Sequence, residues 1–256
     1  MLFLKVLILG LVEGLTEFLP ISSTAHLIII ASWLRLPSNE YWKFFEVFIQ
    51  TGAILAVVTL YFKQLFNRKI IVNLFSSFVL TAIIGLVFYK IIKNYFFESE
   101  FLISLSLISL GIGFLIIERL IKNKKIKLNK DIKNLSVWQA VVIGLSQSLA
   151  IIPGVSRSGA VIVAGLLMGY KREEAALYSF LLAVPTILAA GGLDLIKTDY
   201  QIITSNIGLT LLGFVVSYLT ALLVIKWLIG YLQKKDLIAF GFYRIILGLL
   251  LLLTIF

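Results

Sequence analysis

Two carboxylates, three consecutive hydroxyls and the only histidine of the chain lie within one short segment near the N-terminus. The segment runs E-G-L-T-E-F-L-P-I-S-S-T-A-H, from Glu13 to His26. A second polar segment, P-G-V-S-R-S-G from Pro153 to Gly159, places an arginine between two serines. Both segments are embedded in apolar sequence, where polar groups are costly to bury unless they find partners. Such complementary groups indicate a site that handles a phosphorylated substrate.

Glu13 and Glu17 are four residues apart, so on a helix they share one face. Two carboxylates aimed at one point repel each other, and a divalent cation between them and a phosphate would remove the conflict. Mg²⁺ suits this arrangement because it takes few protein carboxylates and completes its shell with water and phosphate oxygens. We therefore predict a divalent cation, Mg²⁺ or Ca²⁺, at Glu13 and Glu17. The alternative is a glutamate pair that lines a hydrated cavity or binds a proton.

Pro20 is expected to end the first helix, and Ser22, Ser23 and Thr24 have the residue types that start a second one. Free N–H groups and hydroxyls at a helix N-terminus bind anions, which predicts phosphate contacts here. Ordinary helix capping would explain one hydroxyl more readily than three. His26 lies three residues beyond Ser23, a spacing that permits a base to contact the serine hydroxyl. The alternative is a histidine that only donates structural hydrogen bonds.

Arg157 presents a planar fork suited to phosphate oxygens, and its charge is costly at membrane depth. Ser156 and Ser158 would add donors, while Gly154 and Gly159 would let a ligand approach the backbone. The alternative for the empty protein is an internal ion pair between the arginine and one of the two glutamates. That pair would leave the surrounding serines and glycines unexplained.

The composition is that of a membrane protein. Of the 256 residues, 60% are hydrophobic and 14% are charged. The net charge of +10 does not indicate nucleic-acid binding, because the basic residues fall in short segments between apolar runs. The chain has no cysteine, which excludes disulfides, thiolate nucleophiles and zinc–thiolate sites.

Apolar runs of sufficient length predict transmembrane helices at 47–62, 70–89, 101–117, 175–193, 207–225 and 237–256. Regions 1–34 and 137–170 are also apolar but are interrupted by the two polar segments. Each half is too short to span, so both regions are predicted to be re-entrant hairpins.

The order of one hairpin and three spans occurs twice, and weak sequence identity follows it. G-L-T-E at Gly14 matches G-L-S-Q at Gly144, and with a small insertion Pro20 matches Pro153 and Ser23 matches Ser156. Three spans per half require the second half to be inverted, which would bring the two broken helices face to face. The predicted fold is therefore an all-α polytopic membrane protein with an inverted-topology repeat. Its single domain, 1–256, comprises repeat one at 1–121, a Lys-rich cytoplasmic linker at 122–133 and repeat two at 134–256.

The distribution of basic residues predicts the orientation. Placing the Lys-rich linker inside also places most of the basic loops inside, with both termini outside. The first hairpin would then enter the membrane from its outer face.

The two polar segments resemble the two signatures of the undecaprenyl-diphosphatase family, the bacitracin-resistance membrane phosphatases. Residues 45–50, F-E-V-F-I-Q, and 180–185, F-L-L-A-V-P, are also similar to family segments, so the resemblance covers nearly the whole chain. Two departures are Ala25, where the family usually has glycine, and Val161, where it commonly has threonine.

The resemblance implies hydrolysis of undecaprenyl diphosphate to the monophosphate and inorganic phosphate, at the outer face of the bacterial cytoplasmic membrane. This reaction would recycle the carrier lipid for cell-wall synthesis and give bacitracin resistance. By resemblance, Glu17 and Glu13 hold the metal, Ser23 or a water attacks phosphorus, His26 handles protons, and Arg157 stabilises the transferring phosphoryl group. The alternative is a transporter or flippase of a phosphorylated lipid or anion on the same scaffold. The expected partners are the polyprenyl lipid and the bilayer, without nucleic acid, and a homodimer stays open.

Overall fold

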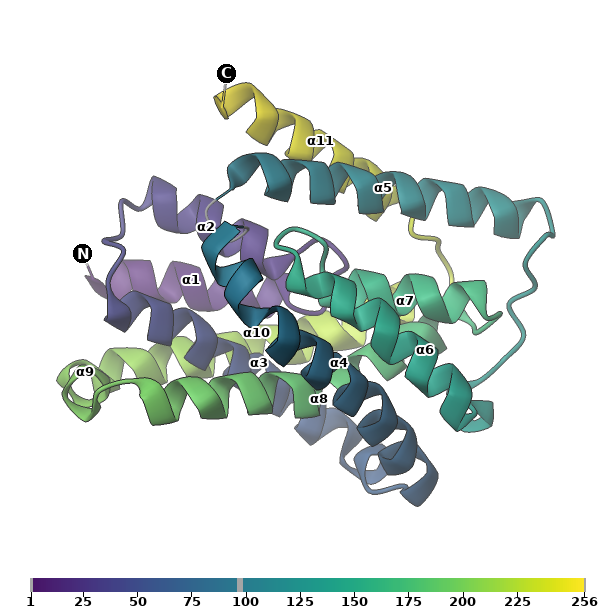
Figure 1. Cartoon of the computed structure of the whole chain (residues 1–256), viewed down its shortest axis with the longest axis horizontal. Coiled ribbons are helices and arrows are strands. Elements are labelled where there is room, and N and C mark those ends of the chain that lie inside the picture. The colour runs from purple at the N-terminus through teal and green to yellow at the C-terminus, as the bar shows by residue number, and fades with distance from the viewer. Residues whose placement is uncertain (1, 96–98, 256) are drawn as a thin grey trace.

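The protein is built from helices and short 3-10 turns joined by loops (Figure 1). The computed structural model describes residues 2–95 and 99–255. The elements are α1 (Leu2–Thr16), α2 (Ser23–Trp33), α3 (Glu40–Leu65), α4 (Arg68–Tyr95), α5 (Glu100–Lys122), η1 (Ile132–Asn134), α6 (Val137–Ser148), η2 (Leu149–Ile151), α7 (Arg157–Leu167), α8 (Arg172–Lys197), α9 (Tyr200–Ser205), α10 (Ile207–Leu232) and α11 (Ile238–Ile255).

Five of the helices in the described part are long and apolar enough to cross a membrane, namely α3, α4, α5, α8 and α10. The sixth predicted span corresponds to α11, whose apolar part, Ile238–Thr254, is shorter. At about 1.5 Å per residue its 17 residues rise roughly 26 Å, slightly less than a hydrocarbon core of about 30 Å. The architecture is that of an all-α polytopic membrane protein.

Both regions predicted to be interrupted are pairs of short helices. Helices α1 and α2 are separated by residues 17–22, which we call break one. Helix α6 with its extension η2 is separated from α7 by residues 152–156, which we call break two. The predicted interruptions are thus confirmed.

Each break ends on a serine with left-handed backbone geometry. Ser22 has φ 73° and Ser156 has φ 70°, and their side chains accept hydrogen bonds from Ala25 N and Gly159 N as N-caps. Non-glycine residues adopt this conformation at a cost of order 1–3 kcal/mol, so surrounding contacts must hold it. Ser22 and Ser156 therefore have the same structural place, each as the N-cap of the second helix of its pair. In the sequence match predicted above, Ser156 corresponds instead to Ser23, the residue that follows the first N-cap.

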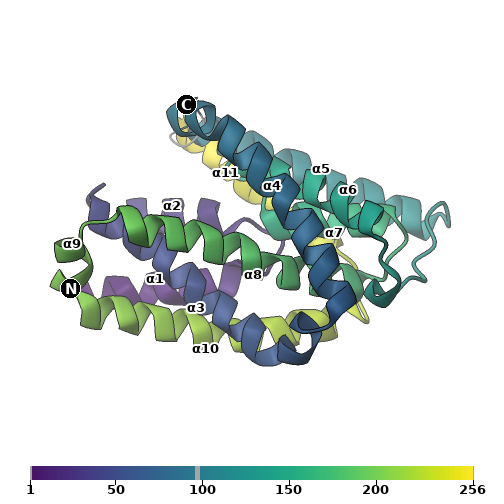
Figure 2. The ribbon, with the colours of Figure 1, turned by 60° about the horizontal axis from the view of Figure 1, so that its bottom comes forward.

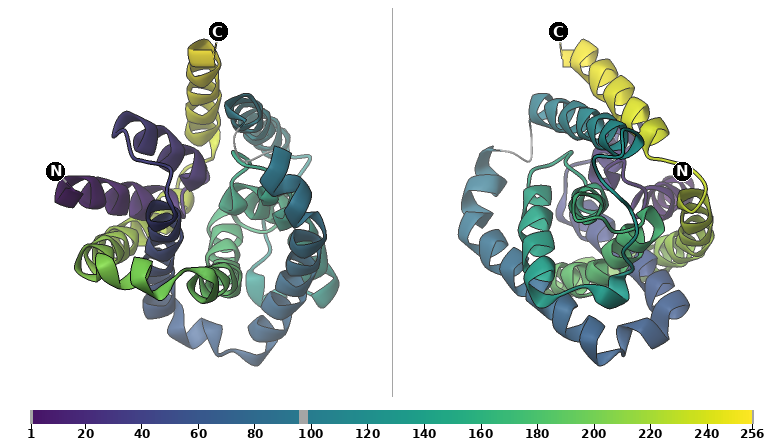
Figure 3. Two further views of the ribbon diagram at one scale, coloured as in Figure 1. Left: turned by 60° about the vertical axis from the view of Figure 1, so that its left-hand side comes forward. Right: turned by 90° about the vertical axis from the view of Figure 1, so that its right-hand side faces the viewer.

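The first helix of each broken pair packs along one of the long helices. Helix α1 lies along α10, and α6 lies along α4. Figure 2 shows α1, α3, α8 and α10 beside one another, with α3 contacting both α8 and α10. On the other side of the molecule, α11 runs along α5 (Figures 1 and 3).

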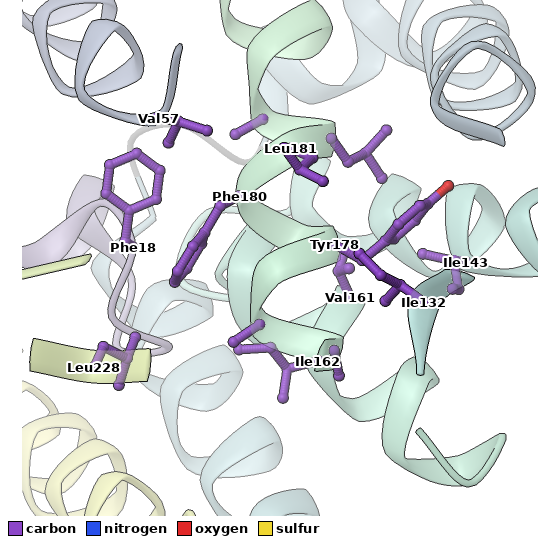
Figure 4. Close-up of a cluster of buried hydrophobic side chains, with 14 of the residues drawn as sticks. Phe18, Val57, Ile132, Ile143, Val161, Ile162, Tyr178, Phe180, Leu181 and Leu228 are labelled. Carbon is purple, nitrogen blue, oxygen red and sulfur yellow. The ribbon is translucent and has the colours of Figure 1, made fainter. Parts of the chain in front are cut away.

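Helix α8 forms a common wall behind both breaks. Phe18 from break one meets Phe180 of α8 edge-to-face, with ring centroids 5.1 Å apart. Val161 and Ile162 of α7 are fully buried in the same cluster, as Figure 4 shows. Dense packing of this kind leaves little freedom for either break to move against the other.

The basic loops gather at one end of the molecule. Lys69 Nζ donates to Lys133 O at 2.6 Å, which ties the start of α4 to the linker. Lys171 pairs with Asp131 at 2.7 Å, and this hydrogen-bonded pair raises the pKa of the Lys171 ammonium. The linker thus contacts the α7–α8 turn and the α3–α4 turn.

The loop before α11 lies at the same end. Arg172 at the start of α8 forms a two-pronged ion pair with Glu118, whose Oε1 also accepts from Leu237 N at 3.0 Å. Because Glu118 is 3% exposed, this carboxylate needs both partners to be stable in its place.

Candidate active site

Break one and break two face a common cavity of about 150 Å³. Both breaks contribute polar groups to it, and Gln50 of α3 with several apolar side chains closes the remainder. Its lining comprises Glu17, Ser22, Ser23, Thr24, Gln50, Ala150, Ile152, Pro153, Gly154, Ser156, Arg157 and Ile187. Most of the predicted site residues therefore come together, although the two segments are far apart in sequence. A concave site with a few convergent polar groups is the usual form of a small-molecule or headgroup site.

A chain of hydrogen bonds links the two breaks through Glu17. Ser23 Oγ donates to Glu17 Oε2 at 2.6 Å, and Arg157 Nη2 donates to Glu17 Oε1 at 2.9 Å. The other terminal nitrogen of the arginine, Nη1, donates to the backbone oxygen of Ser179 on α8 at 2.9 Å. The side chains of Arg157 and Glu17 are only 12% and 7% exposed. The internal ion pair considered from the sequence is therefore present, with Glu17 as the acid.

This arrangement places a serine hydroxyl directly beside a carboxylate. The short hydrogen bond directs the Ser23 proton at a carboxylate, which is the geometry by which a serine hydroxyl is activated. Arg157 lies on the opposite side of that carboxylate and also lines the cavity. A phosphate in the cavity would meet hydroxyl and guanidinium donors together.

The two ring nitrogens of His26 hydrogen-bond to groups other than Ser23, so the expected Ser23–His26 pairing is not among the hydrogen bonds of the described residues. Its Nδ1 lies 2.7 Å from Ser22 O, and its Nε2 lies 2.7 Å from the hydroxyl of Tyr243. The His26 and Tyr243 rings also stack, with centroids 5.7 Å apart and 6° between planes. A helical side chain leans toward the preceding turn, so His26 reaches the Ser22 carbonyl. Because that oxygen only accepts, Nδ1 carries a proton, and in the neutral imidazole Nε2 then accepts from the Tyr243 hydroxyl.

The remaining predicted phosphate ligands divide into two groups. Ser22, Thr24, Ser156 and Gly154 line the cavity. Ser158 is 1% exposed and does not line it, since its hydroxyl donates to Leu19 O at 3.0 Å and lies 3.1 Å from Ser156 Oγ. Ser158 therefore joins break two to break one, and its predicted phosphate contact stays a prediction.

Gly154 is required by its surroundings. Its φ is +90°, and a Cβ there would lie 2.6 Å from Ile103 O. The residue departures noted above cause no visible disruption: Ala25 is buried and Val161 packs in the core. Position 161 thus points into packed side chains, where a valine fits.

Glu13 is a buried carboxylate without hydrogen-bond partners in the described part of the chain. It is 0% exposed, and its charged neighbours are Glu17, Glu46 and Arg157. An unpaired buried carboxylate is costly, which fits a group completed by a bound cation or by a proton. Among the described residues no three His, Asp or Glu side chains converge as a ready-made metal site. Two carboxylates fit a cation that takes its other ligands from water and phosphate.

Two side chains next to the site were not predicted, and both come from α11. Tyr243 contacts His26, and Arg244 donates to backbone oxygens in both breaks. A sequence signal for Arg244 existed, because an arginine inside an apolar run is as costly as Arg157. The tyrosine gave no comparable signal, since aromatic residues are common at helix ends in membranes.

Comparison with known proteins decides the family. The profile described as "Bacitracin resistance protein BacA" matches residues 6–250. The chain belongs to this family. Both breaks, the cavity and α11 up to residue 250 fall inside the region that matches the BacA family.

Relatives with assigned names support the same assignment along the full length. A protein of Sulfurihydrogenibium sp. is 45% identical over 247 residues, which cover 96% of this chain and 97% of the relative. A protein of Aquifex aeolicus is 43% identical over 246 residues, covering 96% and 95%. A protein of Campylobacter fetus is 47% identical over 262 residues, covering 99% of each chain. All three are named undecaprenyl-diphosphatase.

Proposed function

We propose that this multi-pass membrane protein hydrolyses undecaprenyl diphosphate to undecaprenyl phosphate and inorganic phosphate. Its membership of the BacA family and the names of its relatives support this activity. We assign this activity to specific residues from one observation. The hydrogen bonds Ser23–Glu17–Arg157 form a chain that joins the two breaks at the cavity. Bacitracin resistance accords with the family description.

In the proposed reaction, Ser23 Oγ attacks the terminal phosphorus of the diphosphate while Glu17 accepts the hydroxyl proton. A serine-oxygen–phosphorus bond forms, and the bond from phosphorus to the bridging oxygen breaks, so the lipid monophosphate leaves. Water then attacks the phosphoserine and releases phosphate, which restores Ser23. Arg157 stabilises the charge on the transferring phosphoryl oxygens through its fork. The N-terminus of α2, with Ser22 and Thr24, positions the phosphate oxygens.

Glu13 and Glu17 would hold the divalent cation, Mg²⁺ or Ca²⁺. Such an ion supplies charge neutralisation for phosphate oxygens. The oxygens of Glu13 support this assignment, since they accept no hydrogen bond from a donor group among the described residues and a cation would provide that partner.

We further propose the inverted repeat, re-entrant hairpins and outward orientation predicted from the sequence. Two observations support the repeat: the N-caps at Ser22 and Ser156 correspond, and the first helix of each broken pair packs on the second long helix of the other half, α1 on α10 and α6 on α4. The clustering of basic loops at one end supports a cytoplasmic location for that end and an outward-facing site, in the bacterial inner membrane.

Phosphate release from undecaprenyl diphosphate by the purified, detergent-solubilised protein tests the proposal. Ser23→Ala should lose most activity, by at least about 10³-fold, because the attacking oxygen is removed. Ser76→Ala is the matched control, since that hydroxyl bonds only to Val72 O in its own helix. Chelator should abolish wild-type release, and Mg²⁺ or Ca²⁺ should restore it. Wild-type turnover by Ser23→Ala would contradict the proposed nucleophile.

We also propose that His26 handles protons in this reaction. Tyr243→Phe should then lower kcat about 2- to 10-fold, the effect of removing one neutral hydrogen bond from the His26 ring. The ring stack is retained, so the melting temperature should stay near that of the wild type. Tyr200→Phe, at an exposed tyrosine of α9, is the control. If His26→Ala slows turnover while Tyr243→Phe does not, the tyrosine hydroxyl does not position the histidine.

A further inference from the structure

Arg244 is a cation in the protein interior that no step of the proposed reaction uses. It lies on α11 and is 0% exposed. None of the ion pairs formed by the described residues includes it, so its charge is not matched by a carboxylate. Burying a guanidinium in this way is costly, and the groups that surround it must offset that cost.

The partners of Arg244 are backbone oxygens from three separate elements. Nη1 donates to Pro20 O in break one at 3.1 Å. Nη2 lies 2.7 Å from Gly154 O and 3.3 Å from Val155 O, both in break two, and 3.3 Å from Ser106 O on α5. One guanidinium therefore holds both breaks.

The chemistry of the breaks explains why an arginine fits here. Non-helical backbone leaves carbonyl oxygens without the partners that a continuous helix would supply, and within a membrane these need other donors. The planar fork of arginine serves several oxygens at fixed angles, which a lysine ammonium cannot do. The ring of Phe114, 5.9 Å from the guanidinium carbon, covers it further.

Arg244 acts from behind the cavity and not inside it. Gly154 lines the cavity, whereas Arg244 does not, so the arginine reaches the site through the backbone that it binds. Its own helix is held firmly, because α11 approaches α5 so closely that a Cβ on Gly241 would lie 3.1 Å from Gly111 O. The α5–α11 pair is thus a fixed support for the guanidinium.

We propose that Arg244 is a positioning residue that sets break one against break two, and thereby sets Ser23 and Glu17 against Arg157. This inference rests on the proposed function of the same site. It gives α11, which was predicted only as a membrane span, a part in catalysis. The contribution is to the alignment of groups that lie on different breaks, not to substrate contact.

Arg244→Lys in the full-length purified protein tests this role, with undecaprenyl diphosphate as substrate. We expect kcat to fall by about 10²-fold, since misplacing catalytic groups by about 1 Å has effects of this size. KM should change little, because the cavity lining is unaltered. Ile246→Ala, an exposed position two residues along α11, is the matched control and should turn over normally. Arg244→Gln, neutral but still a donor, is the second variant and should also lose kcat.

The energetic coupling between Glu17 and Arg157 separates positioning from simple stabilisation. We expect Glu17→Gln and Arg157→Lys to be less strongly coupled in the Arg244→Lys background than in the wild type. A lowered melting temperature with normal kcat and normal coupling would overturn the proposal, as would loss of the fold in both Arg244 variants. If the wild type itself releases no phosphate, the proposed function fails; if it does and Arg244→Lys matches it, only this inference fails.

Discussion

Glu17→Gln should slow phosphate release by about 10²- to 10⁴-fold, the range for loss of a general base. Glutamine has the same size and can still accept from Ser23 and Arg157, but it cannot take the serine proton or neutralise the guanidinium. The melting temperature in the same detergent should therefore change much less than the rate. The measurement is the initial rate of phosphate release from undecaprenyl diphosphate.

The control for Glu17→Gln is the same exchange at Glu40, an exposed residue at the start of α3. Glu40→Gln should release phosphate at the wild-type rate. A Glu17→Gln protein that folds and retains full activity would show that the short hydrogen bond to Ser23 has no part in the reaction.

Arg157→Lys should slow turnover by about 10²- to 10³-fold, the usual effect of losing one aligned donor to a developing charge. Lysine keeps the positive charge and can still pair with Glu17, so the fold should survive. It lacks the fork that now spans Glu17 and the Ser179 carbonyl, and so cannot hold two phosphoryl oxygens at once. Initial rates and melting temperatures of both proteins give the comparison.

Arg68→Lys, at an exposed position at the start of α4, is the matched control for the arginine exchange. It should leave turnover unchanged. If Arg157→Lys melts normally and also turns over normally, Arg157 is a structural ion-pair partner only, and a transport function becomes the better account of the site.

The sequence predicted the two broken helices and their meeting because polar residues at membrane depth have few acceptable places. Glu17 and Arg157 needed either an ion-pair partner or a polar cavity, and in the structure they pair with each other and also line the cavity. Helical periodicity also placed Glu13 beside Glu17. These features follow from local spacing and from the energetics of burial.

The contacts of His26 could not be predicted in the same way. Residue spacing allowed His26 to reach Ser23, but its ring leans back along α2 and binds the Ser22 carbonyl instead. The other imidazole contact comes from Tyr243, a residue 217 positions away. Such a contact depends on how α11 packs, which no local pattern encodes.

The contacts that hold break two in place could not be predicted from local spacing either. The hydroxyl of Ser158 is chemically suited to bind a phosphate, yet in the structure it donates a hydrogen bond to Leu19 O. The role of Arg244 depends on three segments meeting at one point. Its presence in an apolar run was the signal, and only tertiary structure supplies its partners.

A double-mutant cycle between Glu17 and Arg157 tests most directly whether the two breaks form one catalytic site. Initial rates of phosphate release are needed for the wild type, Glu17→Gln, Arg157→Lys and the double variant. Groups that act as a unit are strongly non-additive, so the double variant should be about as slow as the slower single variant. If the two losses instead multiply in full, Glu17 and Arg157 act independently, and the single shared site is contradicted.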